Sequence, residues 1–433
     1  MINLLKAISN KQRTRQVLML YSGTIIQLAL GMITSVVIAR ALRPEQYGHY
    51  GFIFNFINLI LIIVSSGHFV SISMILAQSG NESNKRSILG ASFLINLFVS
   101  CIFSAIVFVY TFFHGYIFHN MLAYPLRLLA LPLIFFPMQV YLEAVLMGLN
   151  RIKLLTVMRV LPKALYLIAA LLLIQMDKLN YFTAIMFMLL TSYVVYIGNL
   201  IFLKPNFTNL SRNLHYIEAE NKRYGFQVYV GSLCYGAAIY LCTLSIGYFT
   251  NNTDLGFFNL ALTVATPLFM LPNVIATTFF RNFADAERIP DKLIRYTIVL
   301  SVASYIVFAL CIKEIVLFLY SAEYIQTVML AYILGFGMIV TGIADVFNRF
   351  LSAKALGKVV RNANLIGAGV CILSLFVLVP IYGSSGAAVT RLLVAIAYLS
   401  AMYAYYRKAL AMADHGDVSS CAGRPNAKAL SAE

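Results

Sequence analysis

Long apolar stretches alternate with short polar connections along almost the whole chain. A helix needs about 20 apolar residues to cross the hydrocarbon core of a bilayer, and twelve stretches reach that length. A helix also satisfies its own backbone hydrogen bonds in lipid, so the pattern predicts an all-α integral membrane protein. The predicted spans are Val17–Ala41, Gly48–Leu76, Ser87–Phe112, Met121–Leu146, Leu154–Ile174, Leu179–Phe202, Tyr224–Phe249, Gly256–Phe280, Leu293–Ile312, Tyr324–Leu351, Val359–Pro380 and Gly383–Tyr406.

Composition supports this interpretation. Of the 433 residues, 61% are hydrophobic and 11% are charged, whereas soluble domains are about half apolar and about a quarter charged. The net charge of +16 would suggest nucleic-acid binding in a soluble protein. Basic loops explain it better here, and we expect no nucleic-acid partner.

Basic residues lie mainly on one side of the predicted membrane. Twenty-three of the 32 lysines and arginines fall in segments on the side of the N-terminus, and four fall on the opposite side. Basic residues favour the cytoplasmic side of short loops. Both termini are therefore expected in the cytoplasm.

The two halves of the chain resemble each other. Gly23-Thr24 matches Gly231-Ser232, and the segment 44–50 matches 252–258 at the same offset. Because six spans separate the copies, both run in the same direction, which predicts a parallel repeat about an axis along the membrane normal. We expect two six-helix lobes at 1–203 and 224–410, a cytoplasmic linker at 204–223 and a disordered tail at 411–433.

Eight ionisable residues lie within or at the end of the predicted spans, where charges are costly and usually face a bundle interior. The basic candidates are Arg40, Arg127, Arg159, Lys163, Arg349 and Arg391. The acidic ones are Glu143 and Asp345. This basic excess predicts a cationic cavity between the lobes that holds an anionic group such as pyrophosphate, because the guanidinium fork binds phosphate and stays charged.

Each candidate also has a structural explanation. Asp345 and Arg349 are four residues apart on one helix and could neutralise each other. Arg159 and Lys163 begin a span on the cytoplasmic side and could extend to the interface.

Arg127 and Glu143 are sixteen residues apart on one span, too far to pair along a helix. Arg127 and Arg391 have no acidic residue nearby in sequence, so they are the strongest cavity candidates. Glu143 and Asp345 could instead bind a coupling proton or cation.

Prolines interrupt three of the predicted spans, where they predict bends. They are Pro132, Pro137, Pro162, Pro267 and Pro272.

The sequence contains no Walker A loop, nucleophile elbow or metal-ligand spacing. The cysteines form no C-x-x-C pair. We therefore expect no catalytic residues, metal or cofactor, and no enzyme activity. A polymerase that joins repeat units would need a long extracytoplasmic loop, which is missing.

Three segments resemble signatures of bacterial polysaccharide flippases. Ile38–Tyr50 is similar to the family's first-loop pattern Ala-Arg-x-Leu-x-Pro-Glu-x-Tyr-Gly-x-Tyr. Asp254–Ala261 is a second match, and Val379–Ala388 resembles the Pro-x-Tyr-Gly-x-x-Gly-Ala-Ala pattern before the last span. The second half departs from the first at 252–254, and no site residue can be transferred, because the family's functional charges lie in variable helices.

The resemblance implies membership of the multidrug/oligosaccharidyl-lipid/polysaccharide exporter superfamily and alternating access of two lobes. It implies a flippase in the bacterial inner membrane that moves an undecaprenyl-pyrophosphate-linked O-antigen or capsule repeat unit. A polysaccharide polymerase is a candidate partner, and membrane lipid surrounds the chain. The head group would enter near Arg159, Lys163 and Arg349 and leave toward Arg127, Arg391 and Arg40. The alternatives are a cation-coupled multidrug antiporter, which would need acidic cavity residues, and a flippase of a peptidoglycan precursor.

Overall fold

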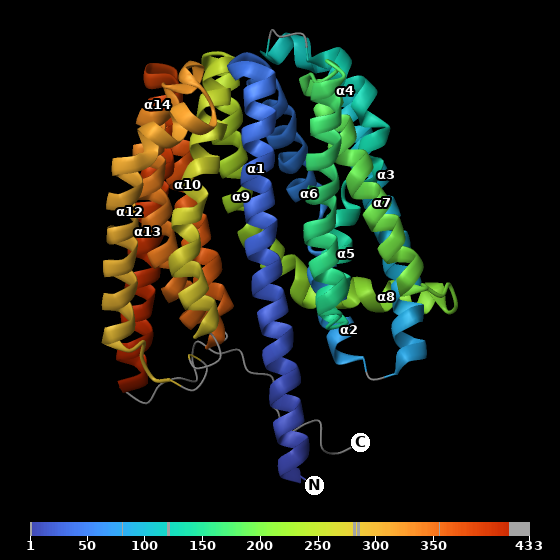
Figure 1. Cartoon of the computed structure of the whole chain (residues 1–433). Coiled ribbons are helices and arrows are strands. Elements are labelled where there is room, and N and C mark those ends of the chain that lie inside the picture. Colours follow the sequence, from blue (N-terminus) through green and yellow to red (C-terminus); the bar gives the residue numbers. More distant parts are fainter. Residues whose placement is uncertain are drawn as a thin grey trace.

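The computed structural model describes residues 2–79, 81–118, 122–279, 283, 286–354 and 356–414, and every regular element in these ranges is helical (Figure 1). The first half contains α1 (Ile2–Val64), α2 (His68–Gln78), α3 (Glu82–Phe118), α4 (Ala123–Ala130), α5 (Met138–Gly148), α6 (Ile152–Gln175), α7 (Tyr181–Leu203) and α8 (Leu210–Glu220). The second half contains α9 (Phe226–Phe249), α10 (Asn252–Thr278), α12 (Asp291–Leu319), α13 (Thr327–Ala353) and α14 (Gly357–Asp414). Short helical turns lie at Pro132–Phe135, Asn221–Gly225 and Ala322–Tyr324.

Two of these elements are helical hairpins. Arg43 in α1 has φ 60° and leaves the helical conformation. The side-chain oxygens of Ser35 and Tyr47 lie 3.2 Å apart, whereas twelve residues of straight helix would separate them by about 18 Å. The chain therefore reverses at Arg43, and α14 is likewise two helices joined at Gly383, where φ is 58°.

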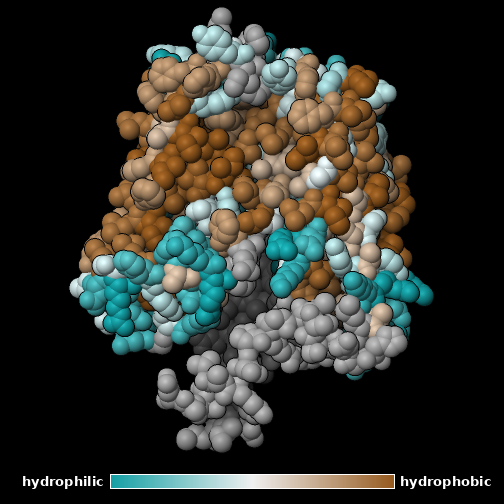
Figure 2. Space-filling model, turned by 180° about the vertical axis from the view of Figure 1, so that it is seen from behind, coloured by the Kyte–Doolittle hydropathy of each residue, from teal (hydrophilic) through white to brown (hydrophobic). Residues whose placement is uncertain are grey.

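The number of spans agrees with the sequence prediction. Within the described ranges, nine helices are long and apolar enough to cross a membrane, or ten with the bent pair α4 and α5 counted as one. Dividing α1 and α14 at their turns gives the predicted twelve. On the face that Figure 2 shows, a broad hydrophobic band has hydrophilic residues above and below it. The chain is a multi-pass membrane protein.

The second and fourth spans are broken; the prolines predicted the bend in the fourth, whereas the break in the second was not predicted. The second is interrupted between α1 and α2, where Ser66 has φ 43° and Gly67 has φ 82°. Glycine is required at 67, because a Cβ there would lie 2.6 Å from the carbonyl oxygen of Gly225. The fourth bends by 55° between Ala130 and Pro132, because proline removes a backbone donor.

The prolines of the fifth and eighth spans do not break the described helices. Pro162 lies inside the continuous helix α6, and Pro267 and Pro272 lie inside the continuous helix α10. The segment predicted as a linker forms α8, which lies across the end of the first lobe in Figure 1. The predicted tail lies outside the described residues from position 415 onward.

Two lobes pack side by side, with α1 between them (Figure 1). In the first lobe α1 packs on α6 and α7, and in the second α13 packs on α10 and α14. The lobes meet where α1 contacts α9 and α10. A large buried apolar cluster extends across this junction and includes Phe52, Phe258 and Tyr324.

The junction has the symmetry that the repeat predicts. A Cβ on Gly48 would lie 1.7 Å from the carbonyl oxygen of Asn252. In the reciprocal contact, a Cβ on Gly256 would lie 2.5 Å from the carbonyl oxygen of Pro44. Gly48 matches Gly256 and Pro44 matches Asn252 in the sequence repeat. A parallel pseudo-two-fold axis therefore passes between the two glycines.

Candidate functional site

The lobes are joined at the end of the molecule where α1 reverses. Arg40 of α1 donates a hydrogen bond to the carbonyl oxygen of Phe318 on α12. Beside it, the Tyr324 hydroxyl donates to the carbonyl oxygen of Ala39 over 2.8 Å. The structure thus places Arg40 in a contact that holds the lobes together, and its side chain is partly exposed.

A second polar contact crosses the junction inside the membrane, and sequence reasoning missed it. The Asn55 amide donates to the Asn259 side-chain oxygen over 3.0 Å and to the carbonyl oxygen of Gly51 over 2.7 Å. The amide nitrogen of Asn259 is buried and has no hydrogen-bond partner among the residues that the structure describes. Gly51 and Asn259 are matched positions of the repeat, so the repeat could have indicated the contact.

Arg127 lies against its own lobe. Its guanidinium stands over the Phe112 ring, 4.5 Å from the centroid, and its Nε donates to the Thr111 hydroxyl over 3.4 Å. Both partners are on α3, and Arg127 itself is exposed. Cation–π contact stabilises a guanidinium that has no carboxylate partner.

Glu143 and Arg159 form an ion pair between α5 and α6. The fourth and fifth spans are antiparallel around a turn at Asn150, whose φ is 54°. Positions at similar distances from such a turn lie at similar depth. Arg127 is indeed not the partner of Glu143, and the pair that does form joins two spans rather than lying along one.

Lys163 lies one turn beyond Arg159 on α6 and points toward α1. Its ammonium lies 3.5 Å from the position that a Cβ on Gly31 would occupy. No carboxylate among the described residues lies within ion-pair distance of Lys163. Its charge is therefore uncompensated in the described part of the chain, while that of Arg159 is paired.

Asp345 is the centre of a hydrogen-bonded group in the second lobe. Arg349 Nε donates to it over 3.2 Å, and the amides of Asn273 and Asn348 donate over 2.7 and 3.1 Å. Asp345 is buried, so these donors offset the cost of removing its charge from water. The i,i+4 pairing considered from the sequence is present.

Arg391 joins α14 to α9. One terminal nitrogen donates to the Thr243 hydroxyl over 3.0 Å and to the carbonyl oxygen of Ile239 over 3.4 Å. Its Nε is buried and has no hydrogen-bond partner in the described part of the chain. The guanidinium thus keeps an unused donor inside the second lobe.

The eight candidates do not form a single cluster, but their pairing follows a rule. Both carboxylates are each bound by an arginine, Glu143 by Arg159 and Asp345 by Arg349. The other four cations have no carboxylate partner among the described residues. They are Arg40, Arg127, Lys163 and Arg391. The uncompensated charge of this set is therefore wholly positive. Within the described ranges, no group of His, Cys, Asp and Glu could hold a metal ion.

A sequence profile described as "Polysaccharide biosynthesis protein" matches residues 14–286. The chain belongs to the polysaccharide biosynthesis protein family. No curated protein sequence matches.

Solved structures of transporters and of a flippase share the fold. An inward-facing multidrug resistance MATE transporter of the MOP superfamily matches with TM-score 0.71 and 14% identity over 90% of this chain and 96% of that one. The lipid II flippase MurJ in an inward closed conformation has TM-score 0.71 and 13% identity over 92% and 90%. A MOP transporter from Pyrococcus furiosus, described as having reverse polarity of its binding pocket and a suggested different function, has TM-score 0.60 and 11% identity over 93% and 96%. The family member described here therefore has the MOP superfamily fold.

Proposed function

We propose that this protein is a flippase that moves an undecaprenyl-pyrophosphate-linked oligosaccharide, an O-antigen or capsule precursor, from the cytoplasmic to the periplasmic leaflet. The observation that carries the proposal is the pairing of both intramembrane carboxylates, which leaves Lys163, Arg391, Arg127 and Arg40 as uncompensated cations. Such a set attracts a pyrophosphate and repels a cationic drug. Family membership supports a substrate from polysaccharide biosynthesis.

The asymmetry of basic loops supports an inner-membrane location with both termini in the cytoplasm. With that orientation, the contacts of Arg40 with Phe318 and of Tyr324 with Ala39 close the periplasmic end. The head group would enter from the cytoplasm, toward Lys163. The lobes would then rock and separate at the periplasmic contacts. A polysaccharide polymerase in the same membrane would receive the product.

The test uses purified protein in liposomes that contain a fluorescent lipid-linked oligosaccharide and a membrane-impermeant quencher. We expect the wild type to exchange label between leaflets faster than protein-free liposomes, Lys163→Ala to be slow, and Lys163→Arg to recover. Arg127→Ala is measured in the same assay. It tests whether Arg127, which lies against α3, contributes to exchange. Normal exchange by Lys163→Ala, Arg391→Ala and Arg127→Ala together would contradict the cationic-site assignment.

A multidrug antiporter is the second candidate, because the MATE transporter and MurJ match the fold equally. It would need Glu143 or Asp345 to bind a proton or cation in place of its arginine. Export of a cationic dye driven by a proton or sodium gradient, and lost on Asp345→Asn, would favour this function. If the protein exchanges the oligosaccharide between leaflets but does not transport the dye, the antiporter function is excluded.

A further inference from the structure

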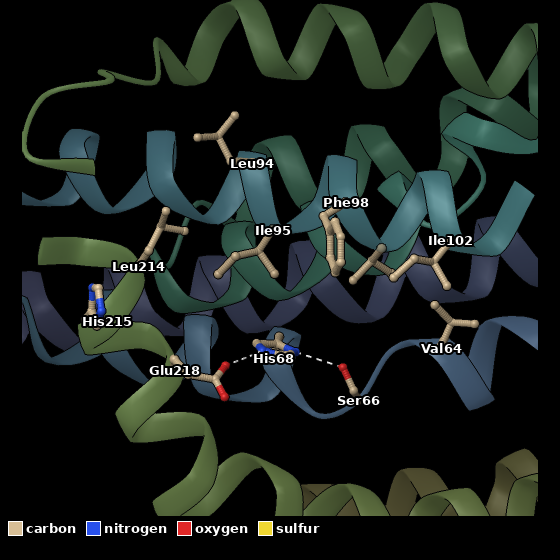
Figure 3. A pocket seen from close by; sticks show the side chains of 11 residues that line it. Val64, Ser66, His68, Leu94, Ile95, Phe98, Ile102, Leu214, His215 and Glu218 are labelled. Carbon is tan, nitrogen blue, oxygen red and sulfur yellow. Dashed lines mark hydrogen bonds and ion pairs between the residues drawn. The ribbon is translucent and has the colours of Figure 1, made fainter. Parts of the chain in front are cut away.

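A pocket with a volume of about 530 Å³ lies in the first lobe, and none of the eight candidate residues lines it (Figure 3). Its wall is apolar, and Ile95, Phe98 and Ile102 of α3 and Leu214 of α8 line it. In Figure 3, Ile95 and Phe98 project from α3 toward His68. Phe98 is 68% exposed on a span with lipid around it. The pocket is therefore open on the side of α3 that Phe98 occupies.

One end of the pocket is polar. Both ring nitrogens of His68 are hydrogen-bonded: Nδ1 lies 2.8 Å from the Ser66 hydroxyl, and Nε2 lies 2.9 Å from the Glu218 carboxylate. His215 of α8 also lines this end. Ser66 and His68 flank the break in the second span, so the break brings polar groups to the foot of the apolar wall.

Helix α8 places this polar end at the membrane surface. It lies across the end of the lobe in Figure 1. It buries Ile217 and packs Leu210 and Leu214 on the apolar cluster of the first lobe. An amphipathic helix with this orientation lies in the head-group region. The pocket thus extends from head-group depth into the hydrocarbon.

Positive charge is in excess around the polar end. Glu218 is bound by His68 and also lies 3.6 Å from Lys222. Glu220 of the same helix is paired with Arg223. Arg212 lies one helical turn before His215, and no described carboxylate lies within ion-pair distance of it. Lys222 and Arg223 thus offset the charges of the two carboxylates, and the charge of Arg212 remains.

We propose that this pocket binds one acidic phospholipid, with an acyl chain along Ile95, Phe98 and Ile102 and the phosphate near His215 and Arg212. An acyl chain matches the apolar wall, and an anionic phosphate matches the remaining charge of Arg212 on α8. The site is independent of the oligosaccharide substrate, because none of the candidate cations lines it.

The chain contains no tryptophan, so one introduced tryptophan is a unique fluorescent probe. Phe98→Trp places it in the pocket wall with little change of shape. Phe202→Trp is the matched control: Phe202 is 70% exposed at the end of α7 and precedes the basic residue Lys204 by two positions in the sequence. Size-exclusion profiles identical to the wild type establish that both variants fold.

Each variant is reconstituted in mixed vesicles in which either phosphatidylglycerol or phosphatidylcholine carries brominated chains that quench tryptophan on contact. In Phe98→Trp, we expect the apparent affinity for brominated phosphatidylglycerol, measured by tryptophan quenching, to exceed that for brominated phosphatidylcholine. The excess should be about fivefold for each basic side chain that contacts the phosphate. The preference should fall when Arg212→Glu is added and when salt is raised. Phe202→Trp should show a smaller preference that Arg212→Glu does not change.

Equal quenching by the two lipids in Phe98→Trp would overturn the proposal. A preference that is the same in both tryptophan variants would also overturn it, because ordinary boundary lipid would then account for the effect. No step of the experiment depends on transport, so loss of the proposed flippase activity would leave its outcome unaffected.

Discussion

Gly48 and Gly256 face each other where the second and eighth spans cross, and neither position has room for a Cβ. Small residues let two helix backbones approach closely in membranes. This contact lies near the end of the molecule where Arg40 and Tyr324 also join the lobes. Alternating access would require this end to open and close, so the glycine pair is a position where the closed state can be weakened selectively.

Gly48→Ala and Gly256→Ala are expected to weaken the closed state. Overpacking of this kind costs about 1–3 kcal/mol, which corresponds to a roughly 5–150-fold change in the ratio of two conformations. Cysteines introduced at Ala39 and Tyr324 in a cysteine-free background should then cross-link more slowly. Oligosaccharide exchange should fall in parallel.

Gly198→Ala and Gly369→Ala are matched controls, because a Cβ at either position has no atom within 4 Å. Both should cross-link and transport like the wild type. Unchanged cross-linking in Gly48→Ala would contradict the role of this contact in closure.

Arg159 and Glu143 are expected to act as one structural unit. Removing one partner leaves the other charge unpaired in the membrane, which is costly. Each single alanine variant should therefore lower the melting temperature, and the double variant should lower it by less than the sum. A coupling free energy of about 0.5–3 kcal/mol is typical of contacting residues.

Transport separates this structural role from substrate binding. If Arg159 serves only Glu143, Glu143→Gln/Arg159→Gln should regain much of the exchange that either single variant loses. Persistent loss of exchange in the double variant at a normal melting temperature would instead make Arg159 a substrate-binding residue.

The sequence was sufficient for the spans and for the repeat, because both depend on local patterns of apolar residues and turns. The parallel axis between Gly48 and Gly256 follows from the same matched segments that the sequence contains. The i,i+4 pair of Asp345 and Arg349 could be foreseen because both lie on one helix.

Contacts between helices could not be foreseen in this way. The pairing of Glu143 with Arg159 depends on the depth at which two antiparallel spans meet. The break at Ser66 and Gly67 lies in the short polar segment Ser65–His68, which a hydrophobicity average over the length of a span conceals. The placement of Arg127 over Phe112 depends on how α4 packs against α3.

Arg391 should tolerate lysine better than alanine. Lysine keeps the positive charge and can still donate one hydrogen bond to Thr243 or Ile239, although it lacks the planar fork. A charged hydrogen bond contributes about 1.5–3 kcal/mol, so Arg391→Ala should slow oligosaccharide exchange by roughly 10–150-fold. Arg391→Lys should lose much less.

Thr243→Val provides the control for Arg391. It removes the hydroxyl acceptor and leaves the guanidinium charge in place. If charge is what matters, Thr243→Val should retain exchange in the liposome assay. Equal losses in Thr243→Val and Arg391→Ala would show that Arg391 serves to join α9 to α14 and does not bind the substrate.

The contact between His68 and Glu218 should make the attachment of α8 depend on pH. The hydrogen bond from His68 lowers the pKa of the Glu218 carboxyl below its ordinary value of 4.5. A carboxylate with a lowered folded-state pKa stabilises the fold above its unfolded-state pKa, and this contribution is lost as the pH falls through the folded-state pKa. The groups facing this contact from the packed elements are Ser66, His215 and Lys222.

Glu218→Gln keeps the shape of the side chain and removes its charge. The melting temperature of the wild type should exceed that of Glu218→Gln at pH 7, and the difference should begin to shrink below about pH 4.5 and vanish below the lowered pKa. Because the chain has no tryptophan, melting is followed by size exclusion after heating. Lys222→Ala is the control: its exposed ion pair with Glu218 should contribute little at any pH. A difference between wild type and Glu218→Gln that stays constant down to pH 3 would show that the carboxylate charge does not hold α8 in place.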